Sequence, residues 1–105
     1  MITVAAYTIC LNEIKHIERW LEANKDADLR VIVDTGSTDG TWEKLQELAD
    51  DNLKVHQIFL KPFRFDDARN AALNLVPADI DVCVSVDMDE IPQEDFYKIL
   101  RKEWL

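Results

Sequence analysis

Glycine, cysteine and long apolar runs are all scarce in this sequence of 105 residues. No apolar run approaches the roughly 20 residues that a membrane-spanning helix needs. The first residues, Met1 to Val4, carry no basic side chain, so we expect a strand there and not a signal peptide. The two cysteines, Cys10 and Cys83, lie in apolar, strand-like stretches, where we expect buried, reduced thiols instead of a disulfide or metal ligands. Together these features favour a cytoplasmic protein without a membrane span.

Positive charge is also in short supply. The formal net charge is −9, which argues against nucleic acid and anionic membrane surfaces as partners. Between Asn70 and Tyr97 there is no Lys, Arg or His, whereas there are seven acids. Two carboxylates about 4 Å apart repel by roughly 4 kcal/mol at an effective dielectric of 20, so these acids either spread into water or surround a cation. A bound metal ion would reverse the local field, so an anionic small molecule stays compatible with this charge.

The composition fits one small domain over residues 1–105, with 48% hydrophobic residues and a single modest core. Apolar runs alternate with helical periodicity along the chain. They predict strands over residues 3–10, 29–33, 53–58 and 82–86, and helices over residues 13–24, 42–49, 68–76 and 92–104. Asn12 is the expected N-cap of the first helix. This order predicts an α/β fold, with a mostly parallel sheet of about four strands and helices on both faces.

The fourth predicted strand ends in a dense group of acids. Residues 82–86 are apolar at every position except Ser85, a pattern typical of a strand buried on both faces of a parallel sheet. Asp87 and Asp89 follow at once, where the carboxyl ends of strands place ligands. A cation site is therefore one interpretation of the pair, and a solvated turn that caps the next helix is the other. The turn explains Glu90, Glu94 and Asp95 well.

Both glycines of the chain, Gly36 and Gly40, fall in the segment after the second strand. Their placement predicts a tight turn with unusual backbone dihedrals, or a close approach of the backbone to a ligand. Three residues between them can cap the following helix, namely Ser37, Thr38 and Asp39. Simple capping therefore stays an alternative for the segment, although capping explains Asp34, at the strand end, less well.

A single arginine stands out in the third predicted helix. Asp66 or Asp67 can cap that helix, which places Arg69 in its first turn. A cation is electrostatically unfavourable there because of the helix dipole. A functional role for Arg69 is one explanation, and a surface pair with an aspartate is the other.

Four segments in order now resemble the family 2 glycosyltransferases. They are Leu11-Asn12-Glu13 after the first strand, residues 33–41 (VDTGSTDGT), the helix start at residues 68–73 (ARNAAL), and Asp87-x-Asp89. The similarity covers nearly the whole chain. It implies the nucleotide-sugar-binding half of that family, which has the Rossmann-like GT-A fold, a three-layer sandwich.

The resemblance also implies a pocket for the nucleotide. Thr8 and Cys10, near the end of the first strand, would edge the nucleobase site, mainly through backbone groups. Asp34 and Thr35 would lie against base and ribose, although many family members have a second acid where this chain has Thr35. Arg69 is similar to the family's arginine that faces the nucleotide.

The metal site implied by the resemblance is the acidic pair. Asp89 would ligate Mn²⁺ or Mg²⁺ directly, and Asp87 would act through ribose or water. Such an ion prefers carboxylate oxygens and, as a Lewis acid, stabilises the leaving nucleoside diphosphate. The implied activity is transfer of a sugar from a nucleoside-diphosphate sugar to a saccharide, lipid or protein acceptor, with inversion.

The resemblance implies that the general base lies beyond Leu105, so no catalytic residue is expected in this chain. We therefore expect about half of a transferase domain, which would not turn over substrate alone. Self-association is expected if aromatic side chains are left uncovered, among them Phe59, Phe63, Phe65 and Trp104. A non-catalytic nucleotide-sugar-binding module stays an alternative. A phosphohydrolase of the haloacid dehalogenase type is a weaker one, because Ile91 stands where that family has a threonine.

Overall fold

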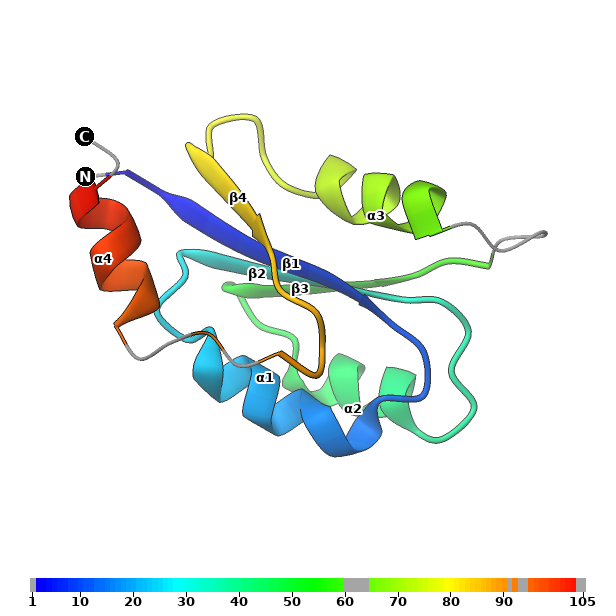
Figure 1. The fold of residues 1–105 in the computed structure, drawn as a ribbon. Coiled ribbons are helices and arrows are strands. Elements are labelled where there is room, and N and C mark those ends of the chain that lie inside the picture. Colours follow the sequence, from blue (N-terminus) through cyan, green and yellow to red (C-terminus); the bar gives the residue numbers. More distant parts are fainter. Residues whose placement is uncertain (1, 60–64, 91, 93–94, 104–105) are drawn as a thin grey trace.

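The computed structural model describes residues 2–59, 65–90, 92 and 95–103, and for residues 65–69 it describes the backbone alone. Within these residues, four parallel strands form one sheet in the order β3-β2-β1-β4 (Figure 1). The strands are β1 (Val4–Cys10), β2 (Leu29–Asp34), β3 (Leu53–Gln57) and β4 (Val82–Ser85). The parallel sheet predicted from the sequence is confirmed.

Helices cover both faces of the sheet (Figure 1). They are α1 (Ile17–Ala23), preceded by the 3₁₀ turn η1 (Ile14–His16), α2 (Thr41–Leu48), α3 (Phe65–Asn74) and α4 (Phe96–Glu103). On one face, Trp20 of α1, Leu45 of α2 and Tyr97 of α4 pack in one buried cluster with alternate residues of β1. On the other face, Ala72 of α3 packs against the intervening strand residues. The result is the predicted three-layer α/β arrangement. None of the helices in the described ranges is both long and apolar enough to cross a bilayer.

Three helix starts differ from the prediction. The last helix, expected from Pro92, begins at Phe96, because Asp95 before it has a left-handed φ of 65°. Asn12 is not an N-cap: Glu13 precedes η1, while Asn12 adopts a left-handed φ of 54° and its side chain accepts a hydrogen bond from the Thr38 N–H. The third helix begins at Phe65, so Asp66 and Asp67 lie inside its first turn instead of capping it. Arg69 therefore belongs to the second turn of α3, and the predicted conflict with the helix dipole does not arise.

The prediction that residues 82–86 are buried on both faces is wrong. In the described sheet β4 lies at the edge, beside β1 alone, and Cys83 and Ser85 are exposed. The physical reason is coverage: α3 packs mainly on β1 and β2, which leaves its side of β4 open. Cys10 is buried as expected, and burial followed by the nearby Asp34 carboxylate raises the pKa of its thiol far above the usual range. Cys10 is therefore an unreactive core thiol, whereas the buried thiol predicted at Cys83 is exposed.

Candidate functional site

The carboxyl ends of the strands bring two acidic groups to one edge of the sheet. Cys10, Asp34 and Gln57 are paired across β1, β2 and β3, so these three strands end at the same level. β4 reaches this edge through Val86, whose N–H donates to the Tyr7 carbonyl at 3.2 Å. Asp34 and the acids that follow Val86 consequently both lie at carboxyl ends of strands in this sheet, where folds of this kind bind ligands.

The Asp34 carboxylate is fully buried and accepts hydrogen bonds from its own surroundings. Its Oδ2 accepts from the Gly36 N–H at 3.1 Å, the Ser37 N–H at 3.0 Å and Gln57 Nε2 at 2.9 Å. The Ser37 hydroxyl donates to Oδ1. Burial alone would raise the pKa of Asp34, but the bonds from Ser37, Gln57 and Gly36 outweigh it and hold that pKa below its usual value. We call residues 35–40, which include Gly36 and Gly40, the glycine segment. Asp34 is thus an ionised residue whose hydrogen bonds hold this segment, and its contact with base and ribose stays a prediction.

The other residues expected at the nucleobase pocket also have internal partners. The Thr35 N–H and hydroxyl both donate to the Cys10 carbonyl, each at 2.9 Å. Thr8 is buried, and its hydroxyl donates to the Ile9 carbonyl at 3.2 Å. These contacts link β1 to the segment after β2. Nucleobase contacts through Thr8, Cys10 and Thr35 stay predictions.

The glycine segment adopts the backbone that its sequence predicted. Gly36 has a φ of 110° and Gly40 a φ of 97°, both unfavourable for residues with a side chain. A Cβ atom on Gly36 would lie 3.3 Å from the ring of Phe59, which is 71% exposed at the same edge. Phe59 is therefore an uncovered aromatic residue, as expected. None of the three predicted caps is the N-cap of α2: Gly40 holds that position without a side-chain capping bond. Asp39, one residue earlier, accepts a hydrogen bond from the Thr41 N–H at 3.0 Å through its Oδ1.

The acids after β4 form a closed turn, residues 87–90, which we call the acid turn. The Glu90 N–H donates to the Asp87 carbonyl at 2.9 Å, and the Asp87 N–H donates to Glu90 Oε1 at 2.8 Å. Met88 is buried in the core cluster, whereas Asp87 and Asp89 on either side of it are exposed. Glu90 thus stabilises a turn with the two aspartates at its surface, and a cation site at this pair stays a prediction.

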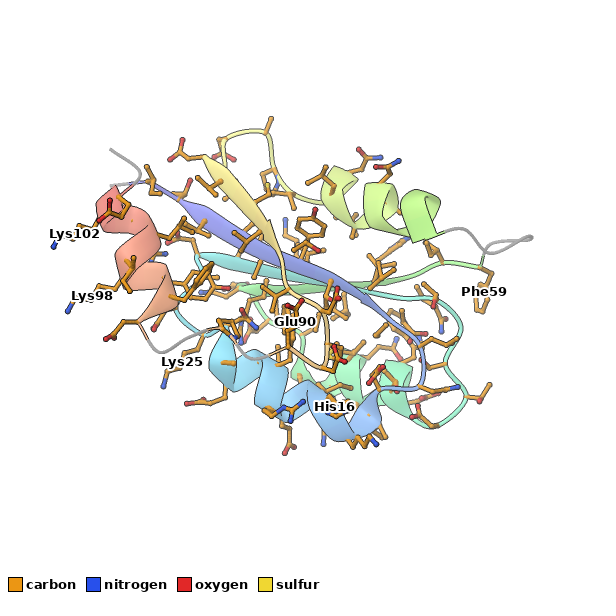
Figure 2. All side chains as sticks on the ribbon, viewed as in Figure 1. His16, Lys25, Phe59, Glu90, Lys98 and Lys102 are labelled. Carbon is orange, nitrogen blue, oxygen red and sulfur yellow. The ribbon has the colours of Figure 1, made fainter. Side chains whose placement is uncertain are left out.

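Two exposed carboxylates suit a magnesium or manganese ion bound together with a ligand. Mg²⁺ is usually held by one or two carboxylates, water and substrate phosphates, not by an all-protein cage. Among the described residues, no group of three or more acidic, histidine or cysteine side chains is arranged to hold a metal ion. A hollow of about 160 Å³ adjoins the turn, lined by Ser85, Val86, Glu90, Pro92 and Phe96. Figure 2 shows Glu90 on the loop after β4 and Phe59 well apart from it.

The predicted role of Arg69 concerns its side chain. Its backbone lies in α3, and its side chain is outside the described residues. The structure adds two residues that the sequence did not single out: Gln57, which donates to Asp34, and Trp20, whose indole N–H donates to the Val86 carbonyl. The parallel register could have indicated Gln57, because it closes β3 at the level of Asp34. No local pattern indicates Trp20, since its partner is 66 residues away.

The chain matches a model of a known protein family. The family model described as "Glycosyl transferase family 2" matches residues 6–104, which is nearly the whole chain. The comparison with curated proteins gave no match.

Proposed function

The chain belongs to the family 2 glycosyltransferases, and on that premise we propose that it binds a nucleoside-diphosphate sugar with Mn²⁺ or Mg²⁺ at the acid turn. The observation that carries this proposal is the pair of exposed aspartates, Asp87 and Asp89, on a turn anchored by Met88 and closed by Glu90. The turn lies at the carboxyl edge of a parallel sheet, where such folds bind ligands.

The residues of the turn fit the chemistry of the proposed ion. Carboxylate oxygens are the ligands that Mg²⁺ and Mn²⁺ prefer. Asp89 would ligate the ion directly, and Asp87 would contact it through water or hold the ribose. A bound ion supplies Lewis-acid stabilisation of the leaving diphosphate.

The proposed reaction is transfer of the sugar, with inversion, to a saccharide, lipid or protein acceptor. Thr8, Cys10, Asp34 and Thr35 would position the nucleoside, and Arg69 would face the diphosphate. We assign no residue of this chain as general base. A cytoplasmic location and self-association through Phe59 also stay predictions.

A thermal-shift screen tests the proposal. Uridine, guanosine and thymidine diphosphates are added to the 105-residue chain, each with Mn²⁺ and each with a chelator. A ligand that binds only the folded state raises the melting temperature by mass action. We expect one diphosphate to stabilise the chain with Mn²⁺ and much less without it. Equal melting temperatures for all three, with and without Mn²⁺, would contradict the proposed site.

Assays of turnover separate the alternatives. Binding without transfer would favour a non-catalytic module, and hydrolysis of a phosphomonoester would favour a phosphohydrolase. The match over residues 6–104 speaks against the phosphohydrolase.

Replacing Arg69 by alanine is expected to weaken diphosphate binding about ten-fold without changing the preference among metals. The reason is that a guanidinium interacts with phosphate oxygens and not with the cation. Titration calorimetry with Mn²⁺ and with Mg²⁺ measures both quantities. Arg19→Ala is the matched control, because Arg19 is an exposed arginine on α1. An equal loss of affinity in both variants would show that Arg69 has no special role.

A further inference from the structure

The acid turn is held in place by α1, an element far away in the sequence. Trp20 is fully buried, and its indole Nε1–H donates to the Val86 carbonyl at 2.9 Å. Val86 is the residue directly before Asp87. Its own N–H donates to the Tyr7 carbonyl of β1, so the peptide groups on both sides of Val86 have fixed partners. The direction in which the chain enters the acid turn is therefore set by β1 and Trp20 together.

A second set of hydrogen bonds holds the helix that follows the acid turn. Tyr97, at the start of α4, is buried, and its hydroxyl donates to Asn24 Oδ1. Asn24 is fully buried, and its Nδ2 donates to the Trp20 carbonyl at 2.9 Å. Trp20 and Asn24 are four residues apart, so they lie on one side of the helix and its cap. They thus anchor the chain before the acid turn, at Val86, and after it, at Tyr97.

The indole N–H of Trp20 has a role that its ring volume does not explain. A buried carbonyl without a donor is costly, so the Val86 carbonyl needs a partner in this position. A purely apolar side chain would fill the same space but would leave that carbonyl free to turn. Rotation of that peptide group would change the orientation of Asp87 and, through the closed turn, that of Asp89.

We propose that Trp20 is a positioning residue, which orients the acid turn through its indole N–H and so sets the affinity for the metal-bound diphosphate. This inference rests on the proposed function of the turn. Groups that hydrogen-bond to metal-binding residues without contacting the metal typically contribute ten- to hundred-fold to metal affinity. The effect should therefore fall on metal-dependent binding and not on the contacts of the nucleoside.

The test compares Trp20→Phe with Trp42→Phe in the 105-residue chain. Trp42 of α2 packs against the same core cluster, so its variant controls for the loss of an indole there. Affinity is measured by calorimetry for uridine, guanosine and thymidine diphosphates with Mn²⁺ and with a chelator, at a temperature where circular dichroism shows each variant folded. We expect Trp20→Phe to weaken Mn²⁺-dependent binding about ten-fold, with Trp42→Phe within about two-fold of the wild type. Equal affinities in the two variants would overturn the proposal.

Amide hydrogen exchange separates this inference from the proposed function. The Glu90 N–H, which closes the acid turn, should exchange faster in Trp20→Phe and unchanged in Trp42→Phe. If the wild type binds no diphosphate, the proposed function fails, and Glu90 exchange alone decides whether Trp20 holds the turn. Equal exchange rates of the Glu90 N–H in both variants would then refute the positioning role of Trp20. Should Trp20→Phe not fold, replacing Trp20 by benzothienylalanine removes the N–H while keeping the ring volume, with the same outcomes.

Discussion

Asp89→Ala is expected to abolish metal-dependent binding of a nucleoside diphosphate while leaving the fold intact. Asp89 is exposed, whereas Met88 beside it provides the packing of the acid turn, so the substitution removes little from the core. It does remove the proposed direct ligand of the ion. Loss of a supporting group alone costs ten- to hundred-fold in metal affinity, so we expect a loss of at least about hundred-fold here. Titration calorimetry with Mn²⁺ measures it.

Two further variants sharpen this experiment. Asp51→Ala changes the net charge equally, but Asp51 is exposed in the turn before β3, at the amino end of that strand, and its variant should bind like the wild type. Asp89→Asn keeps one oxygen and loses the charge, so its affinity should fall between those of Asp89→Ala and the wild type. Unchanged affinity in Asp89→Ala would defeat the metal assignment, provided that denaturant unfolding shows equal stability.

The sequence predicts the order of elements well because that order depends on local patterns. Apolar runs and helical periodicity indicated four strands and their connecting helices, and the sheet is parallel as expected. What these patterns cannot show is which neighbours cover a strand. The run at residues 82–86 looks like a central strand, yet β4 lies at the edge of the described sheet and exposes Cys83. Coverage depends on where α3 packs, and that is a tertiary property.

Asn12 shows a second limit of prediction from local sequence, which concerns the backbone conformation of a single residue. Its residue type favours both an N-cap and a left-handed backbone, because a short polar side chain can hydrogen-bond locally in either. The structure takes the second option: Asn12 has a φ of 54°, its side chain accepts from the Thr38 N–H, and its own N–H donates to Ser37 Oγ. The choice depends on the glycine segment 25 residues later. Local sequence alone could not have decided it.

The sequence singled out acids at the ends of the second and fourth strands, and their role as a site stays a prediction. The sequence did not show that they differ in kind: Asp34 is buried and surrounded by donors, whereas Asp87 and Asp89 are exposed on a turn. Asp34 thus holds its own segment by hydrogen bonds, whatever its proposed contact with the nucleoside, whereas ligand binding is proposed for the acid turn. A substitution at Asp34 should therefore lower the stability of the fold, whereas one at Asp89 should lower the affinity for the ligand.

Asp34→Ala is expected to lower the free energy of unfolding by about 3 kcal/mol or more. The substitution leaves four half-buried N–H and O–H donors, the N–H groups of Gly36 and Ser37, the Ser37 hydroxyl and the Gln57 amide, without their acceptor. An unsatisfied buried donor costs about 1–3 kcal/mol, and small domains are stable by only about 5–15 kcal/mol. Urea unfolding, followed by circular dichroism, measures the change. A loss below about 1 kcal/mol would mean that these hydrogen bonds contribute little.

Asp34→Asn and the pH dependence of stability test the charge separately. Because the pKa of Asp34 is lowered in the folded state, the ionised group stabilises the fold above its unfolded pKa of about 3.8. That contribution is lost as the pH falls through the lower, folded-state pKa. The wild type should therefore exceed Asp34→Asn in stability at neutral pH, and the difference should shrink on acidification below about pH 4. Asp51→Asn, at an exposed position, controls for the loss of one charge. A difference between wild type and Asp34→Asn that stayed constant from neutral pH to pH 2 would show that the charge of Asp34 does not stabilise the glycine segment.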